Sequence, residues 1–266
     1  PTMGDWDLLA SGSYNGPNGI GWCPAGWTSY ERAYAGWLDI EELKAGDIIT
    51  GMKDLEDYEG KAYAIYNDNH RDEFYLLENH KNQGWDAYTP EGGLLVIHVD
   101  YDKALFDNNI VNSKGTFTPA QGYDGIYTND HPRMAPFSKI RSVTNETYYY
   151  TYPMEAPRGV LDSLTNVSKP AATLYNALAD GSTLMGKPIY NIKKDAETGD
   201  ISFSFMTKDT GAETAVREIP YTEDSFSAED NVYDLTGKLV GKRAGSLKPG
   251  IYIIGNKGRT RKIIVR

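Results

Sequence analysis

A nearly continuous apolar run at residues 94–99 limits the folds open to this chain more than any other feature. The six residues read LLVIHV, and only His98 interrupts the hydrophobic side chains. A strand with one face in water alternates apolar and polar residues, whereas a strand that is buried on both faces does not. The run therefore predicts a strand that is covered on both faces of its sheet.

Other strand patterns lie close to this run, and one helix precedes them. Residues 62–66 and 73–78 are rich in aromatic and aliphatic side chains and are separated by turn-forming residues. Upstream, Thr28 and Glu31 have the spacing of a capping box, which predicts a helix that ends near Gly36. Residues 39–43 could add one short turn. We expect an α+β, strand-rich fold, in which a glycine-rich loop region and one short helix precede a mostly antiparallel sheet.

Three further segments organise the rest of the chain. Residues 102–131 form a long polar stretch that has the composition of a loop, and structureless loops of this length are uncommon in compact domains and usually functional, ion-stabilised or mobile. Residues 170–178 fit either a short helix or an ordered loop. Residues 189–193 and 201–205 have the pattern of a hairpin. The sequence predicts one domain over residues 1–206, an acidic linker over 207–224 and a basic, all-β tail of two hairpins over 225–266.

Charge and composition exclude several classes of partner. The chain has 27 Lys and Arg against 37 Asp and Glu, a formal net charge of −10. Nucleic acids and anionic membranes bind clustered basic charge, so we expect neither as a partner. No apolar run reaches the ~18–20 residues of a transmembrane helix, and no signal-peptide pattern opens the sequence. The single cysteine, Cys23, excludes an intramolecular disulfide and every multi-thiolate metal site.

His98 and the acidic residues after it are the main candidates for site chemistry. His98 and Asp100 lie two apart in a strand and therefore on one face, where the carboxylate could orient the imidazole for acid–base or metal chemistry. The alternative is a structural histidine. Asp100, Asp102 and Asp107 form an oxygen-rich cluster typical of calcium sites, although without EF-hand periodicity, and a solvated acidic loop explains them equally well. Glu31 could polarise a ligand, but the capping box already accounts for it.

Several stretches, taken in order, resemble the region downstream of the zinc helix in immune-inhibitor-A-type secreted metallopeptidases, a metzincin-like family. The resemblance covers roughly residues 4–205. It is carried by residues 6–14 (WDLLASGSY), 30–38 (YERAYAGWL), 74–79 (FYLLEN), 84–86 (GWD), 93–100 (GLLVIHVD), 109–112 (NIVN) and 131–134 (HPRM).

The resemblance assigns expected roles to residues of this chain. The family's zinc ligands and general base lie on an H-E-x-x-H-x-x-G-x-x-D helix, and no two of the four histidines here have the H-E-x-x-H spacing. The first stretch resembles the Met-turn, an apolar floor beneath the zinc, with Leu9 at the methionine position. Leu9, Ser11 and Tyr14 would then lie near the cleft. Glu31, His98 and Asp100 would have structural or substrate-side roles.

The resemblance implies part of a zinc-dependent endopeptidase that acts on peptide or protein substrates. An upstream segment of the same precursor would hold the zinc, this chain would begin after it, and the chain alone would be inactive. The tail resembles secretion or sorting modules of Bacteroidetes exoproteins, which implies a secreted or cell-surface protein. The alternative is a non-catalytic extracellular binding module, in which some of the 20 tyrosines and 5 tryptophans hold glycan or protein.

Overall fold

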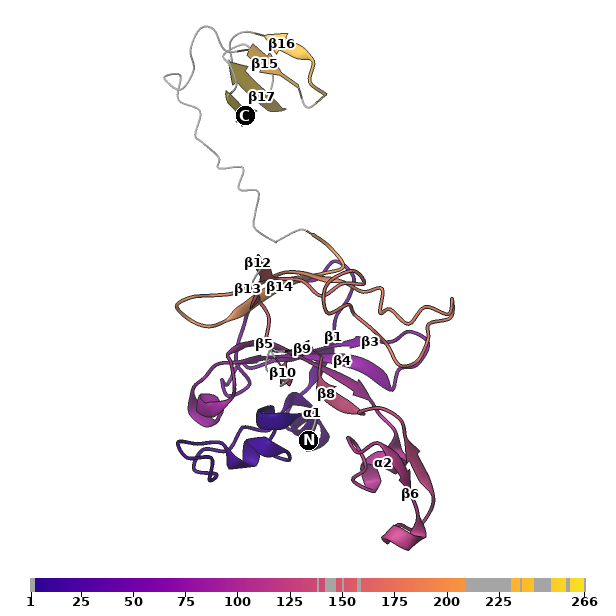
Figure 1. Ribbon diagram of the computed structural model, residues 1–266. Coiled ribbons are helices and arrows are strands. Elements are labelled where there is room, and N and C mark those ends of the chain that lie inside the picture. Colours follow the sequence, from indigo (N-terminus) through magenta and orange to yellow (C-terminus); the bar gives the residue numbers. More distant parts are fainter. Residues whose placement is uncertain are drawn as a thin grey trace. The chain divides into compact units, whose positions relative to one another are not determined.

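The computed structural model describes most of a first unit and part of a second. The described residues are 3–137, 139–141, 147–149, 151–156, 159–208, 231–234, 236–241, 250–256 and 259–265. They divide between two compact units, Pro1–Gly211 and Ala212–Arg266 (Figure 1). The predicted linker over residues 207–224 lies almost entirely outside the described residues.

A five-stranded sheet forms the centre of the first unit. Its strands, in spatial order, are β1 (Ile40–Glu42), β3 (Ala62–Tyr66), β4 (Glu73–His80), β5 (Gly93–Asp100) and β8 (Met134–Pro136). β1 runs parallel to β3, and every other neighbouring pair is antiparallel. The register of β4 and β5 places Glu73 opposite Asp100 and Tyr75 opposite His98, which brings polar side chains together at one end of the sheet.

The prediction that residues 94–99 form a strand covered on both faces is confirmed. All eight residues of β5 are buried. Leu94 and Val96 belong to a core cluster on one face, whereas Leu95, Ile97 and Val99 belong to a second cluster on the other face. Successive side chains of a strand point to opposite faces, so an uninterrupted apolar run supplies both cores at once.

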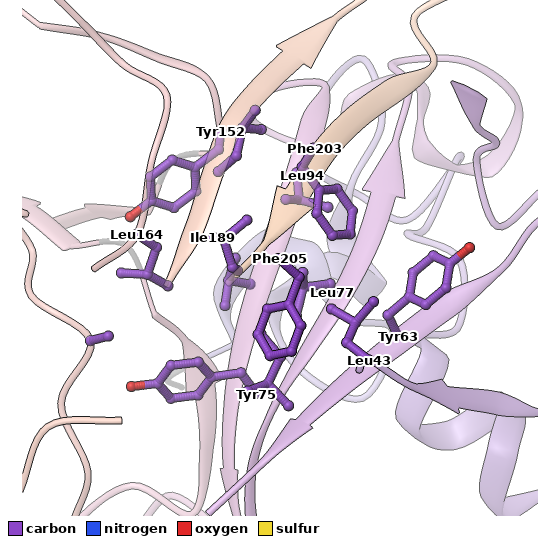
Figure 2. Packing of buried hydrophobic residues seen from close by; sticks show 14 of the residues in the cluster. Leu43, Tyr63, Tyr75, Leu77, Leu94, Tyr152, Leu164, Ile189, Phe203 and Phe205 are labelled. Atoms are coloured by element: carbon purple, nitrogen blue, oxygen red, sulfur yellow. The ribbon is translucent and has the colours of Figure 1, made fainter. Parts of the chain in front are cut away.

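A second sheet covers one face of the first. It contains β13 (Ile189–Lys194), β14 (Ile201–Phe205) and β2 (Ile48–Met52), all antiparallel, and it includes the predicted hairpin. Figure 2 shows Phe203 and Phe205 of β14 among Leu77, Leu94 and other residues of the central sheet. Burial of such aromatic side chains is a main source of the stability of a domain of this size.

The N-terminal segment covers the opposite face. It contains the 3-10 helices η1 (Gly4–Trp6) and η2 (Ser11–Tyr14) and the α-helix α1 (Ser29–Tyr34). Met3 and Trp6 are buried in the second core cluster. The predicted capping box is present, because Glu31 Oε2 accepts a hydrogen bond of 2.8 Å from the N–H of Thr28. Gly36, with a φ of +74°, follows the end of the helix as expected.

Two expectations for local structure were wrong. Residues 39–43 hold strand β1 and not a helical turn, because pairing with β3 satisfies their backbone. Residues 102–131 are not a continuous loop, because they contain helices and strands. Asp102 caps the first of these helices by accepting a hydrogen bond of 3.1 Å from the N–H of Leu105. This segment contains α2 (Lys103–Asp107), β6 (Gly115–Phe117), η4 (Pro119–Gln121) and β7 (Tyr127–Asn129).

Short strands complete the described part of the chain. β9 (Lys139–Arg141) pairs with β10 (Thr147–Tyr149), and β11 (Met154–Ala156) pairs with β12 (Gly159–Leu161). Residues 170–178 form an ordered loop without a helix. The second unit contains the two predicted hairpins, built from β15 (Asn231–Tyr233), β16 (Leu239–Gly241), β17 (Gly250–Asn256) and β18 (Arg259–Val265). The α+β, strand-rich fold is confirmed. Among the described residues, no helix has the length and apolar character needed to cross a membrane.

Candidate functional site

The N-terminal turn that carries Leu9, Ser11 and Tyr14 has a fixed backbone and an exposed apolar surface. Asp7 Oδ1 accepts a hydrogen bond of 2.7 Å from the N–H of Leu9. Gly12 approaches the same residue so closely that a Cβ there would lie 2.6 Å from the Asp7 carbonyl oxygen. Leu9 is nevertheless 72% exposed, and Tyr14 is also exposed. The turn thus exposes the apolar side chain of Leu9 to solvent.

Two carboxyl groups near this turn have raised pKa values. Burial, reinforced by the negative charge of Asp7, raises the pKa of Glu31 to about 7, although the Thr28 hydroxyl opposes the shift. Burial also raises the pKa of Asp7, against the effect of its hydrogen bond from Leu9. Glu31 therefore exchanges a proton near neutral pH. A carboxyl group in this state suits general acid–base chemistry, but its hydrogen bonds are those of the helix cap.

Replacement of Glu31 by glutamine is expected to remove the charge and keep the helix cap, because glutamine also fits a capping box. A carboxyl group with a raised pKa in the folded state destabilises the protein when it is ionised. The E31Q variant should therefore be at least as stable as the wild type at pH 8, and its advantage should vanish as the pH falls from about 7 towards 4.5. Urea unfolding at several pH values measures this difference. A variant that is much less stable at every pH would contradict it.

His80 forms a buried triad that was not predicted from the sequence. Its ring lies between Asp86 in the 3-10 helix η3 (Gly84–Tyr88), at 2.6 Å, and Glu78, at 2.8 Å. The two carboxylates also accept hydrogen bonds from the backbone N–H groups of Gly26 and Ser29, respectively. Burial alone would lower the pKa of His80, but its two carboxylate partners raise it to about 10. The imidazolium therefore links the central sheet to the N-terminal segment.

His98 has a different carboxylate partner from the one expected. Its Nε2 lies 2.8 Å from Glu73 Oε1, and no hydrogen bond to Asp100 occurs in the described structure. Its ring stacks on Tyr175 with ring centroids 4.7 Å apart. On the other side of the Tyr175 ring, His131 stacks at 3.8 Å. The Tyr175 ring thus lies between the imidazoles of His98 and His131, and the stack connects three residues that are far apart in the sequence.

Asp100 is buried and fully engaged by neighbouring side chains. Its Oδ2 accepts hydrogen bonds from His131 at 2.7 Å and Arg133 at 2.6 Å. Its Oδ1 accepts one from Asn176 at 3.0 Å, and the half-exposed His70 lies 3.7 Å away. These contacts attach two loops to the end of β5. His98 and Asp100 lie two residues apart on β5, but each has its own partners.

The three carboxylates predicted to bind calcium have separate roles. Asp100 pairs with Arg133, Asp102 caps α2, and Asp107 forms an ion pair of 2.5 Å with Lys103. Calcium binding stays a prediction. Among the described residues, no group of three or more His, Cys, Asp or Glu side chains could hold a metal ion. The described residues therefore do not fit a zinc site. The thiol of Cys23 lies 3.4 Å from the carbonyl oxygen of Gly84.

Tryptophan side chains line a groove beside the N-terminal helix. The groove encloses about 440 Å³, and we call it the tryptophan groove. Its lining includes Trp27, Trp37 and Trp85 together with Pro24, Arg32 and Glu56. The sequence showed many aromatic residues but not that these three gather, because residues 27, 37 and 85 belong to separate segments. A Cβ at position 26 would lie 2.7 Å from Glu56 Oε1, so a larger residue there would displace the end of the Glu56 side chain.

Comparisons with known proteins add no relative. No family model, curated protein or solved structure matches this chain. The resemblance to immune-inhibitor-A-type metallopeptidases therefore stays a prediction.

Proposed function

We propose that this chain is part of a secreted zinc-dependent endopeptidase, to which it contributes the floor and the substrate-side wall of the cleft. The observation that supports this most is Leu9, which is 72% exposed on a turn whose backbone is fixed by Asp7 and Gly12. An apolar side chain presented in this way gains stability when an apolar neighbour covers it. Leu9 is also the residue that the family resemblance places at the Met-turn.

The chain's own residues would position substrate and not carry out the bond cleavage. In the family that the chain resembles, the zinc ligands lie on an H-E-x-x-H helix, so the metal ligands would come from a segment upstream of these residues. Ser11 and Tyr14 lie on the same 3-10 helix, next to Leu9, and could contact a bound peptide. Asp7 holds the turn through its hydrogen bond from the N–H of Leu9, and Glu31 caps the helix that follows.

The test compares the natural gene product with its Leu9 variants. We expect that product to contain an H-E-x-x-H segment, to hold one zinc per chain and to cleave casein. The L9D variant should lose most of its casein cleavage, since it puts a charge on the apolar floor, whereas L9M should keep its activity. The matched control is L239D, because Leu239 is also exposed but lies in the second unit.

Two results would contradict this proposal. One is a gene product without an H-E-x-x-H segment that leaves casein intact when zinc and calcium are added. The other is an L9D variant that cleaves as fast as the wild type. Detection of the protein in the culture medium or on the cell surface tests the secreted location separately.

A further inference from the structure

We infer that the tryptophan groove binds a lysine or arginine side chain of an extended polypeptide. This goes beyond the proposed peptidase role and does not depend on it, because binding can be measured on this chain without any cleavage. The inference rests on the aromatic lining of the groove, on the charge at its edge and on its size.

The aromatic lining supplies surfaces that attract cations. Trp27 and Trp37 meet edge to face, with ring centroids 5.5 Å apart and an interplanar angle of 60°. Trp37 is 69% exposed and Trp85 is 56% exposed, so a large part of each indole surface is open to solvent. Exposed aromatic groups that gather at one place mark binding surfaces, and the indole ring is the side chain that binds cations most strongly through its face.

Arg32 lies in the groove but is not available to bind an anion. Its Nε donates to the carbonyl oxygen of Trp27 at 2.8 Å, and its Nη1 donates to that of Leu55 at 2.9 Å. Its Nη2 pairs with Glu56 Oε1. All three guanidinium nitrogens are therefore engaged by the protein itself. Arg32 fixes the wall of the groove and does not present a free positive charge to a ligand.

The loop that follows Glu56 adds negative charge near the groove. Glu56 lines the groove, and its ion pair with Arg32 balances its charge. The same loop carries Asp57 and Glu59, whose side chains are exposed. The whole chain has a formal net charge of −10. An acidic ligand would be repelled here, whereas an ammonium or guanidinium group would be attracted.

The size and walls of the groove fit a long cationic side chain. A volume of about 440 Å³ lies in the lower part of the range for small-ligand sites. Leu8 and Pro24 offer apolar contact for the methylene stem of lysine or arginine, while the charged end reaches Trp37 and Glu56. A neutral sugar could also stack on the tryptophan faces and donate hydrogen bonds from its hydroxyl groups to Glu56, but it would lack the attraction between opposite charges.

The experiment titrates the full chain with peptides that differ in charge alone. The probe is a nonapeptide of alternating glycine and lysine, and its counterparts carry glutamine or glutamate in place of lysine. Isothermal titration calorimetry and tryptophan fluorescence report binding. We expect the lysine peptide to bind best and the glutamate peptide not to bind. Raising the salt from about 50 to 500 mM should weaken the lysine complex, since added ions screen exposed charges.

Variants locate the site. Trp37→Ala and Trp85→Ala should each weaken the lysine peptide by about tenfold, the effect of losing one cation–π contact. Trp22→Ala is the matched control, because Trp22 is 74% exposed but does not line the groove. Glu56→Gln should also weaken binding, with the thermal midpoint measured to show that the variant is folded. The tryptophan variants decide the test if Glu56→Gln does not fold.

Four outcomes would overturn the inference. The first is equal binding of the glutamine and lysine peptides, which would show that charge has no role. The second is an equal loss of binding in Trp22→Ala, which would place the site elsewhere. The third is binding of cellohexaose but of no peptide, which would make the groove a glycan site. Nα-acetyl-lysine amide should bind more weakly than the peptide, since it lacks the flanking backbone; equal binding would show that no polypeptide is needed.

Discussion

Replacement of His80 by alanine is expected to lower the free energy of unfolding by about 3–5 kcal/mol. The side chain is 2% exposed and contacts two buried carboxylates, Glu78 and Asp86. Removing the imidazolium leaves two buried carboxylates that keep their backbone hydrogen bonds but lose their positive partner, and this costs far more than a lost surface contact. Urea unfolding followed by circular dichroism at pH 7 measures the loss.

His70→Ala is the matched control for this experiment. His70 is half exposed, and its closest carboxylate oxygen is 3.7 Å away, so its removal should change the stability by less than about 0.5 kcal/mol. The pH dependence gives a second check. The pKa of His80 is raised in the folded state, so its contribution is complete below about 6.5 and is lost as the pH rises towards 10. A deficit in the H80A variant that stayed constant from pH 7 to pH 10 would contradict a charged His80.

Replacement of Glu73 by glutamine is expected to cost about 3 kcal/mol and to loosen the loop at residues 173–178. Glu73 Oε1 accepts hydrogen bonds from His98 and from the N–H of Tyr175, and Oε2 accepts them from Asn67 and from the N–H of Asn176. In either orientation, the amide nitrogen of glutamine would face two donors. Hydrogen exchange should therefore become faster at the amides of Tyr175 and Asn176.

Glu42→Gln provides the control, because Glu42 is exposed and pairs with Arg71 at the surface, where such pairs contribute about 0–1 kcal/mol. Burial would raise the pKa of Glu73, but its hydrogen bonds from His98 and the surrounding groups outweigh burial and lower the pKa to about 2. The stability that Glu73 contributes is therefore present above about pH 4.5 and is lost as the pH falls towards 2. Unchanged exchange at Tyr175 in the E73Q variant would show that the loop is held by other contacts.

The central sheet and the layers that cover it could be predicted because the sequence patterns that indicate them are local. An uninterrupted apolar strand at residues 94–99 requires cover on both faces, and the structure provides the second sheet on one face and the N-terminal segment on the other. The capping box of Thr28 and Glu31 depends on residues three apart and was recognised for the same reason. Strand β1 was missed, since three residues with two glutamates form a strand only when a neighbouring strand pairs with them.

The buried polar groups were harder to predict, because their partners are distant in sequence. His98 was paired with Asp100, two residues away, whereas its partner Glu73 lies on the adjacent strand. A signal for the His80 triad was nevertheless present. Glu78 and His80 alternate on one face of a strand that is otherwise apolar, and charged groups in such a strand must be paired. The tryptophan groove left no comparable pattern, since three separate segments form it.

The pairing of β2 with β14 has a consequence for the order of folding. Gly51 in β2 donates to the hydroxyl of Ser202 in β14, a residue 151 positions later. Closing so long a segment has a high entropic cost, and contacts of this kind slow folding. During synthesis, the core between the two sheets cannot close until β14 has left the ribosome. Until then the apolar face with Tyr63, Leu77 and Leu94 is open to water, and this is when the nascent chain is most exposed to aggregation.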